Sequence, residues 1–253
     1  MPSPDLAKIT KFVEANIGEF HEKRLAKLGT LKLGEVLKRK NPYLFRAKNL
    51  STPETFVRAI LDAYLSSQEE TVFGEFLEKL AIYVCTLAYK GWKSGIPGID
   101  LELNREDRRY IVSIKSGPNW GNSEQIKKLR SSFKAAATTL RTSNSKINVH
   151  AVNGCCYGRD NKPDKGDYEK LCGQRFWEFI SGDADFYTQV IEPVGHQAKK
   201  RNDDFAEKYD QVLTLFSQEF AAEYCVNGKI DWSKIVVLGS SALAPKAVKI
   251  AKH

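Results

Sequence analysis

The residues from Pro97 to Lys115, which read PGIDLELNREDRRYIVSIK, give the clearest indication of the fold of this chain. It contains two short runs, 99–103 and 110–115, in which apolar and polar side chains alternate. The polar segment NREDRR separates the two runs. Alternation with period two on both sides of a polar connection is typical of a β-hairpin. We therefore expect a sheet to form around a hairpin at these residues.

Charged side chains stand inside both predicted strands. Because successive side chains of a strand point to opposite faces, Asp100 and Glu102 should share one face of the first strand. Ser113 and Lys115 should likewise share one face of the second. Charges within apolar strands are costly unless they are paired or used, and carboxylates beside a cation suit metal-assisted hydrolysis of a phosphodiester. Asp100 and Lys115 are therefore the leading candidates for an active centre.

Helices are predicted on both sides of the hairpin, because apolar residues recur there at spacings of three and four. Asp5 and the pair Thr52-Pro53 are typical of helix starts. The expected helices before the hairpin cover 5–28, 52–65 and 69–89; a basic helix over 123–140 and a strand over 146–153 follow it, with aromatic helices around FWEFI and FAEKYDQVLTLFSQEFAAEY after residue 159. This order predicts an α/β fold.

Length and composition favour one substantial core. The chain has 253 residues, of which 42% are hydrophobic, too apolar a composition for a disordered protein. We expect a single domain over 1–253, with a helical arm and a basic loop at 1–66, a core at 67–158 and a helical addition at 159–253. The formal net charge of +8 leaves open a polyanionic partner, either nucleic acid or an anionic membrane surface.

Several classes of function lack their defining residues. The five cysteines contain no CxxC pair and the four histidines form no HxH or HExxH set, which argues against zinc sites. The GxSxG, GxxxxGKS and GxGxxG motifs of serine hydrolases, P-loop NTPases and dinucleotide-binding proteins are absent. The first apolar stretch carries acids and no apolar run reaches the length of a bilayer, so we expect a cytoplasmic protein without a membrane partner.

The predicted order of elements resembles the αβββαβ core of the PD-(D/E)XK nuclease superfamily, a mixed central sheet flanked by helices. Pro97-Gly98-Ile99-Asp100 and Ser113-Ile114-Lys115 match its two half-motifs. Two departures are visible: the proline and the aspartate are not adjacent, and a serine occupies the second acidic position. Some restriction endonucleases of the superfamily also have Ser-x-Lys and use a relocated glutamate. The resemblance therefore implies a second carboxylate from elsewhere in the chain.

The relocated glutamate has four candidates. In the superfamily, a glutamate often follows a glycine on the helix before the first strand, and Gly74-Glu75-Phe76-Leu77-Glu78 fits this pattern best at Glu78, with Glu75 close behind. Glu102 lies on the right face of the strand, and Glu124 opens the next helix. Each of these could instead be an ordinary solubilising residue, since glutamates on helices are mostly exposed.

The resemblance also implies roles for the residues of the site. Asp100 and one glutamate would bind Mg²⁺, or Mn²⁺ in its place, together with the carbonyl of Ile114. Lys115 would orient or deprotonate the attacking water and offset the charge that builds on the phosphate. Ser113 would hydrogen-bond a metal-bound water.

A wider resemblance, to the PmeII-type family of type II restriction endonucleases, extends over residues 30–235. It rests on SGPNWGNSEQ directly after Lys115, on KRKNPYLFRAKN from Lys38 and on CGQRFWEFISG from Cys172. It implies double-stranded DNA as substrate, Mg²⁺ as cofactor and a short recognition sequence. A homodimer is expected because two active sites must meet two strands, and a cognate DNA methyltransferase would be the functional partner.

Two segments are candidates for contact with DNA. KRKNPYLFRAKN sets basic residues among aromatics, which suits a loop that binds phosphates and stacks on bases, although a solvated loop fixed by two buried aromatics fits equally well. After Lys115, amides and an indole could read base edges or stack, although the indole could also belong to the core. The candidate residues are Lys38, Arg39, Lys40, Tyr43 and Arg46, then Asn119, Trp120, Asn122, Gln125, Lys127 and Lys128.

Two other functions remain open at this point. One is a less specific nuclease of the same fold that acts in repair or on DNA junctions. The other is a catalytically inactive DNA-binding module, which the serine at position 113 would permit because it replaces an expected acid.

Overall fold

The computed structural model describes residues 4–143 and 145–242, which form two compact units. The first unit contains the chain up to Phe20 and Thr71–Ala198; the second contains His21–Glu70 and the chain from Lys199 onward. Helices α1 (Leu6–Gly29) and α4 (Pro53–Tyr89) contribute residues to both. The units therefore combine stretches that are distant in sequence, and their limits differ from the expected segment boundaries at residues 66 and 158.

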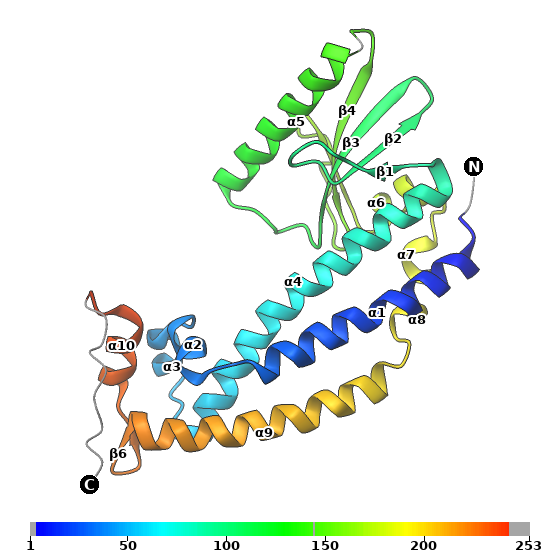
Figure 1. Ribbon diagram of the computed structural model, residues 1–253. Helices are drawn as coiled ribbons and strands as arrows, with labels where there is room; N and C mark the ends of the chain where they lie inside the picture. The colour runs from blue at the N-terminus through cyan, green and yellow to red at the C-terminus, as the bar shows by residue number, and fades with distance from the viewer. Residues whose placement is uncertain (1–3, 144, 243–253) are drawn as a thin grey trace. The chain divides into compact units, whose positions relative to one another are not determined.

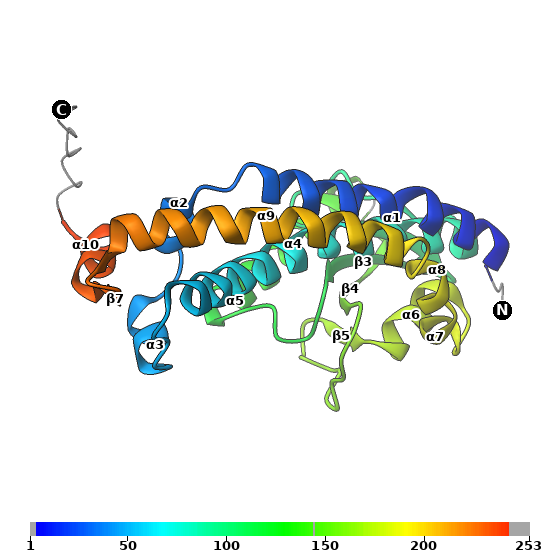
Figure 2. The same ribbon diagram turned by 90° about the horizontal axis from the view of Figure 1, so that it is seen from below.

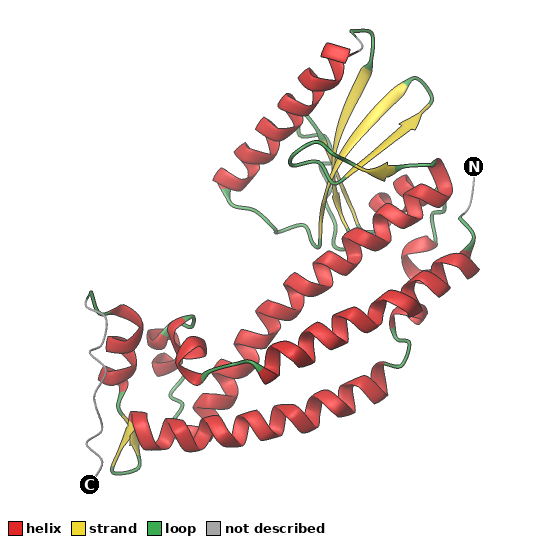
Figure 3. Ribbon diagram, viewed as in Figure 1, coloured by secondary structure: helices red, strands yellow, loops and turns green. Residues whose placement is uncertain are grey.

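The first unit is built on a five-stranded mixed sheet, visible in yellow in Figure 3. Its spatial order is β1 (Trp92–Lys93), β2 (Leu101–Arg105), β3 (Arg108–Lys115), β4 (Asn148–Cys155) and β5 (Glu169–Cys172). The first three strands are antiparallel, whereas β3, β4 and β5 run parallel. Helix α5 (Ser123–Ser143) connects β3 to β4. The predicted fold class, a mixed central sheet flanked by helices, is confirmed.

The hairpin pairs Leu101 with Val112. Its first strand begins and ends two residues later than predicted, and its second strand begins two residues earlier. Only Glu106 and Asp107 form the turn, because the flanking polar residues of NREDRR continue the pairing as far as Arg105 and Arg108. A two-residue turn requires positive φ, and Glu106 adopts 56°.

Helices cover both faces of this sheet (Figure 1). The C-terminal half of α4 and the first half of α1 pack on one face, where Leu80 contacts the core around Leu101 and Val112. Helix α5 packs on the other face, with Phe133 near Ile111. Because residues 111 and 112 point to opposite sides of the strand, the hairpin has an apolar core on each face.

Helices α6 (Gln174–Ser181), α7 (Phe186–Gln189) and α8 (Ile191–Val194) are grouped together in the first unit (Figure 2). Their aromatic residues, Phe176 and Phe186 among them, belong to the core on the α4 side of the sheet. The predicted helix at FWEFI is therefore confirmed. The short strands β1 and β5 were not expected.

The two helices predicted over 52–65 and 69–89 are one helix, α4. No glycine or proline interrupts residues 65–69, so nothing stops the helix there. The predicted starts are confirmed: Asp5 Oδ1 accepts a hydrogen bond from the backbone N–H of Ala7 at 3.0 Å, and Thr52 Oγ1 accepts one from Thr55 at 3.2 Å.

As far as residue 242, the second unit is helical apart from one small hairpin. It consists of α2 (Leu33–Lys38), α3 (Pro42–Ala47), most of α9 (Ala198–Tyr224), β6 (Cys225–Val226), β7 (Lys229–Ile230) and α10 (Trp232–Ser240), with parts of α1 and α4. Its core joins residues of α2, α4, α9 and α10, such as Leu33, Leu61 and Phe220. Among the described helices, none has the length and apolar character needed to cross a membrane.

The prediction of a basic loop at KRKNPYLFRAKN is wrong, because most of this segment is helical. The Asn41 side chain accepts from the N–H of Tyr43 at 3.0 Å, and Pro42 occupies the first helical position, so the pair starts α3 instead of breaking the chain. Of the two aromatics, Phe45 is buried and Tyr43 is 65% exposed.

Candidate active site

Asp100 lies directly before β2, at the open end of the hairpin and opposite its turn. Its backbone N–H donates to the carbonyl of Val112 at 2.9 Å, which extends the pairing by one residue. Its carboxylate Oδ2 accepts from the N–H of Ile114 at 2.6 Å and from Ser113 Oγ at 3.3 Å. The half-motif Ser113-Ile114 therefore holds Asp100 in place, and Ser113 bonds to the carboxylate itself.

Glu78, on the C-terminal half of α4, belongs to the same site. Its Oε1 accepts from Lys93 Nζ at 3.0 Å, and its charge raises the pKa of Asp100. The charge of Asp100 in turn helps to raise the pKa of Lys93, although the larger cause is the bond to Glu78. Two carboxylates and an ammonium group thus lie within electrostatic reach of one another.

The surroundings of Asp100 disfavour a bare negative charge. Burial raises the pKa of its carboxyl group most strongly, and the charge of Glu78 adds to this effect. The Ile114 N–H, the Lys115 ammonium and the Ser113 hydroxyl act in the opposite direction, but the pKa remains above its ordinary value. A divalent cation held by the two carboxylates would offset the unfavourable burial and mutual repulsion of their charges, because it favours their ionised forms.

Lys115 ends β3, and its side chain is half-buried. Its Nζ lies 5.4 Å from the centre of the Trp120 ring. The positive charge of Lys115 lowers the pKa of Asp100, so the ammonium group lies within electrostatic reach of this carboxylate. The structure therefore brings together Asp100, Lys115, Ser113 and Glu78.

The other candidate glutamates are placed differently. Glu102 is buried, and its two oxygens accept from Ser94 Oγ at 2.9 Å and pair with Arg109 at 3.1 Å, so it serves a structural ion pair. Glu124 is exposed on α5 and pairs with Lys127 at 2.9 Å. Glu75 is exposed on α4. Of the four, Glu78 is the one whose charge acts on Asp100.

Lys93 is the site residue that the sequence did not reveal. It lies on β1, a strand of two residues that is too short to show alternation. Only the pairing of Trp92 with Glu102 and of Lys93 with Leu101 brings it beside Glu78.

The donor set fits a hard divalent cation. Within the described residues, no group of three or more histidine, cysteine, aspartate or glutamate side chains could hold a metal ion. Mg²⁺ does not need such a cage, because it is usually held by one or two carboxylates and completes its octahedron with water and substrate phosphates. Asp100 and Glu78 supply two carboxylates within electrostatic reach of each other. A part for the backbone carbonyl of Ile114 stays a prediction.

The amides predicted to read DNA have a structural task. Gln125 Oε1 accepts from the N–H of Asn122 at 2.9 Å, and Asn122 Oδ1 accepts from the N–H of Gln125 at 3.0 Å. This reciprocal pair caps the start of α5. Trp120 is half-buried and donates from Nε1 to Asn153 Oδ1 at 3.0 Å, whereas Asn119 is exposed.

The predicted basic contacts are mostly exposed. In the first unit, Lys127 pairs with Glu124, and Lys128 is exposed. In the second unit, Lys40 is half-buried and donates to the carbonyl of Ala63 at 2.6 Å. Of the other basic candidates there, Lys38 pairs with Glu35 at 3.3 Å, and the guanidinium groups of Arg39 and Arg46 lie 5.9 and 5.5 Å from the ring centres of Tyr64 and Trp232. Their contact with DNA stays a prediction.

Comparison with known proteins gives one family. The family model described as type II restriction endonuclease EcoO109I matches residues 7–202, a stretch that includes Glu78, Lys93, Asp100 and Lys115. No curated protein matches the chain. The matching family is not the PmeII-type family, so kinship with the latter stays a prediction.

Proposed function

The chain belongs to the type II restriction endonuclease EcoO109I family, and on this premise we propose that it hydrolyses double-stranded DNA at a short specific sequence with Mg²⁺. The observation that supports this most strongly is the meeting of Glu78, Asp100 and Lys115 at the end of the hairpin. The superfamily that we propose for this core is PD-(D/E)XK, because α4, β1, β2, β3, α5 and β4 follow one another in the order αβββαβ.

In the proposed mechanism, the chain supplies ligands, a cation and positioning. Asp100, Glu78 and the carbonyl of Ile114 would hold Mg²⁺. When bound, Mg²⁺ polarises the scissile phosphate and makes water a better nucleophile. Lys115 orients the attacking water and offsets the negative charge that grows on the phosphate. Ser113 fixes the carboxylate of Asp100 through its hydroxyl.

Two partners follow from this function. A homodimer would place one active centre on each DNA strand. A cognate methyltransferase would protect the host DNA. A protein of this kind would use contacts outside the hairpin to recognise the base sequence of its DNA site, since catalytic residues alone do not specify bases.

The proposal is tested with long duplex DNA of varied sequence and Mg²⁺. We expect discrete fragments on a gel, and no fragments when EDTA is present. A smear would instead indicate the less specific nuclease. DNA that stays intact at every Mg²⁺ and Mn²⁺ concentration, but is still bound, would identify the inactive DNA-binding module.

The assignment of Glu78 has its own test. Glu78→Gln should raise the Mg²⁺ concentration for half-maximal cleavage by roughly tenfold or more, because one of two carboxylate ligands is lost. Glu75→Gln is the matched control, since it removes the same charge from an exposed position of the same helix. An equal Mg²⁺ requirement for both variants would show that another group completes the site.

A further inference from the structure

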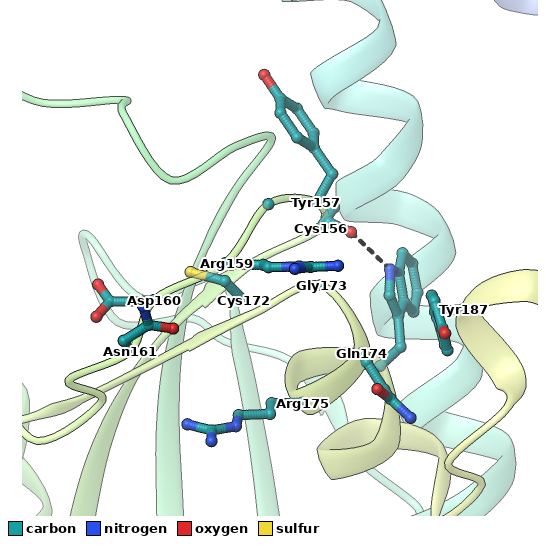
Figure 4. A pocket seen from close by; sticks show the side chains of 12 residues that line it. Cys156, Tyr157, Arg159, Asp160, Asn161, Cys172, Gly173, Gln174, Arg175 and Tyr187 are labelled. Atoms are coloured by element: carbon teal, nitrogen blue, oxygen red, sulfur yellow. Dashed lines mark hydrogen bonds between the residues drawn. The ribbon is translucent and has the colours of Figure 1, made fainter.

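A cavity of about 490 Å³ lies in the first unit at the carboxyl ends of β4 and β5 (Figure 4). Its walls come from residues 156–161, which follow β4, from the end of β5 and the start of α6, and from Tyr187 of α7. The carboxyl ends of parallel strands are a common place for ligands in α/β proteins. The roles proposed above involve none of these residues.

The cavity adjoins the edge of the sheet that carries the candidate active site. Lys115 on β3 pairs in register with Cys155 on β4. The next two residues are tied to the same strand end: Cys156 donates its N–H to the carbonyl of Lys115 at 2.9 Å, and Tyr157 donates to that of Ser116 at 3.1 Å. One wall of the cavity therefore begins directly beside the lysine of the site.

Positive charge dominates the lining. Arg159 and Arg175 are both exposed, and neither is paired with a carboxylate in the part of the chain that the structure describes. The acid of the lining, Asp160, is already neutralised by Lys165 at 3.0 Å and Lys170 at 3.5 Å. Two guanidinium groups without acidic partners suit a phosphate, because their planar N–H donors match its oxygens.

Three aromatic side chains also line the cavity. The rings of Tyr157 and Tyr187 are 53% and 41% exposed. Trp177 donates from Nε1 to the carbonyl of Cys156 at 2.7 Å, the bond drawn in Figure 4, and this fixes the inner wall. Exposed rings beside cations are typical of sites that bind the backbone and bases of nucleic acids.

Close backbone contact shapes the cavity. Gly173, which precedes α6, has φ 56°, and a Cβ placed there would lie 2.6 Å from the carbonyl oxygen of Gly158. Neither the conformation nor the space admits another residue at position 173. The loop after β4 and the start of α6 are thus held together, with Arg159 on one and Arg175 on the other.

We propose that this cavity, the arginine pocket, binds a phosphodiester group of the DNA strand that passes the candidate active site. Its arginines hold the backbone at a fixed distance from the hairpin and so position the scissile phosphate. The inference rests on the proposed function, but it concerns binding and can be tested without cleavage.

The test measures the affinity of a labelled duplex as a function of salt, in the Asp100→Ala background so that the DNA stays intact. Arg159→Gln with Arg175→Gln should weaken binding roughly tenfold or more and lower the slope of log Kd against log salt by about 2. Arg159→Lys with Arg175→Lys should keep most of the slope, because the charges remain.

The control is Lys8→Gln with Lys11→Gln, which removes the same charge from exposed positions of α1 in the same unit. If the arginine variant bound DNA as the control does, with the same salt slope, the proposal would be overturned. The alternative ligand is a free nucleotide, and titration with a deoxynucleoside monophosphate tests for it. If the arginines bound this nucleotide while the arginine variant kept the DNA affinity of the control, the proposal would also be overturned. Failure of wild-type cleavage would count only against the proposed function.

Discussion

Replacing Asp100 by alanine is expected to slow DNA cleavage by roughly a thousandfold or more. The carboxylate would be a ligand of Mg²⁺, and a metal site contributes several kcal/mol of transition-state stabilisation, of which each 1.36 kcal/mol is worth a factor of ten. The rate is measured in single turnover with excess enzyme, so that product release and weak binding do not hide the chemical step.

Asp107→Ala is the control for this prediction. Asp107 stands in the turn of the same hairpin, its side chain is 81% exposed, and its loss changes the net charge by the same amount. We expect this variant to cut within about threefold of the wild-type rate, since exposed substitutions away from a site have small effects. Comparable cleavage by the two variants would remove Asp100 from the active centre.

Local signals in the sequence predicted the hairpin and the helix starts. Alternation between residues 99 and 115 predicted a hairpin across NREDRR, and the structure pairs its two strands with Leu101 opposite Val112. Asp5 and Thr52 were recognisable as caps because a short polar side chain before an apolar period bonds to the free N–H groups of a helix. Such features depend on neighbours in the chain, so they can be predicted.

Features that depend on distant partners could not be predicted in this way. The position of Lys93 beside Glu78 follows from the pairing of a two-residue strand at the edge of the sheet, which leaves no periodicity. The ion pair between Glu102 and Arg109 depends on the hairpin register, so pattern alone left Glu102 among four candidate glutamates. The resemblance already favoured Glu78, and the structure adds a physical reason to set Glu102 aside, its ion pair with Arg109.

Two polar segments have local structural tasks that the sequence pattern did not reveal. Asn122 and Gln125 satisfy each other's backbone N–H groups at the start of α5. Asn41 does the same for α3, within a segment expected to be a loop. In both cases a side-chain oxygen accepts from a backbone N–H that lies two or three residues away, a partner that depends on the local backbone conformation.

Replacing Lys115 by methionine should slow cleavage by about a hundred- to a thousandfold while the protein still binds duplex DNA within roughly tenfold of wild type. A positioned cation acts mainly on charge that develops in the transition state, so its loss costs rate more than ground-state binding. Methionine keeps much of the apolar length of the lysine, which preserves its packing beside Trp120. Single-turnover rates and equilibrium binding separate the two effects.

Lys11→Met is the matched control, because Lys11 is exposed on α1 and loses the same charge. It should cut and bind as the wild type does. If Lys115→Met lost binding and rate in equal proportion, Lys115 would be a phosphate contact of the ground state. If it kept the wild-type rate, the hairpin would hold a metal without needing a cation, and the activation of water would fall to the carboxylates alone. Lys115 also lowers the pKa of Asp100, so its replacement could weaken the metal site as well. A folded Lys115→Met variant that binds Mg²⁺ with wild-type affinity but cuts slowly would show that the lysine charge itself is needed.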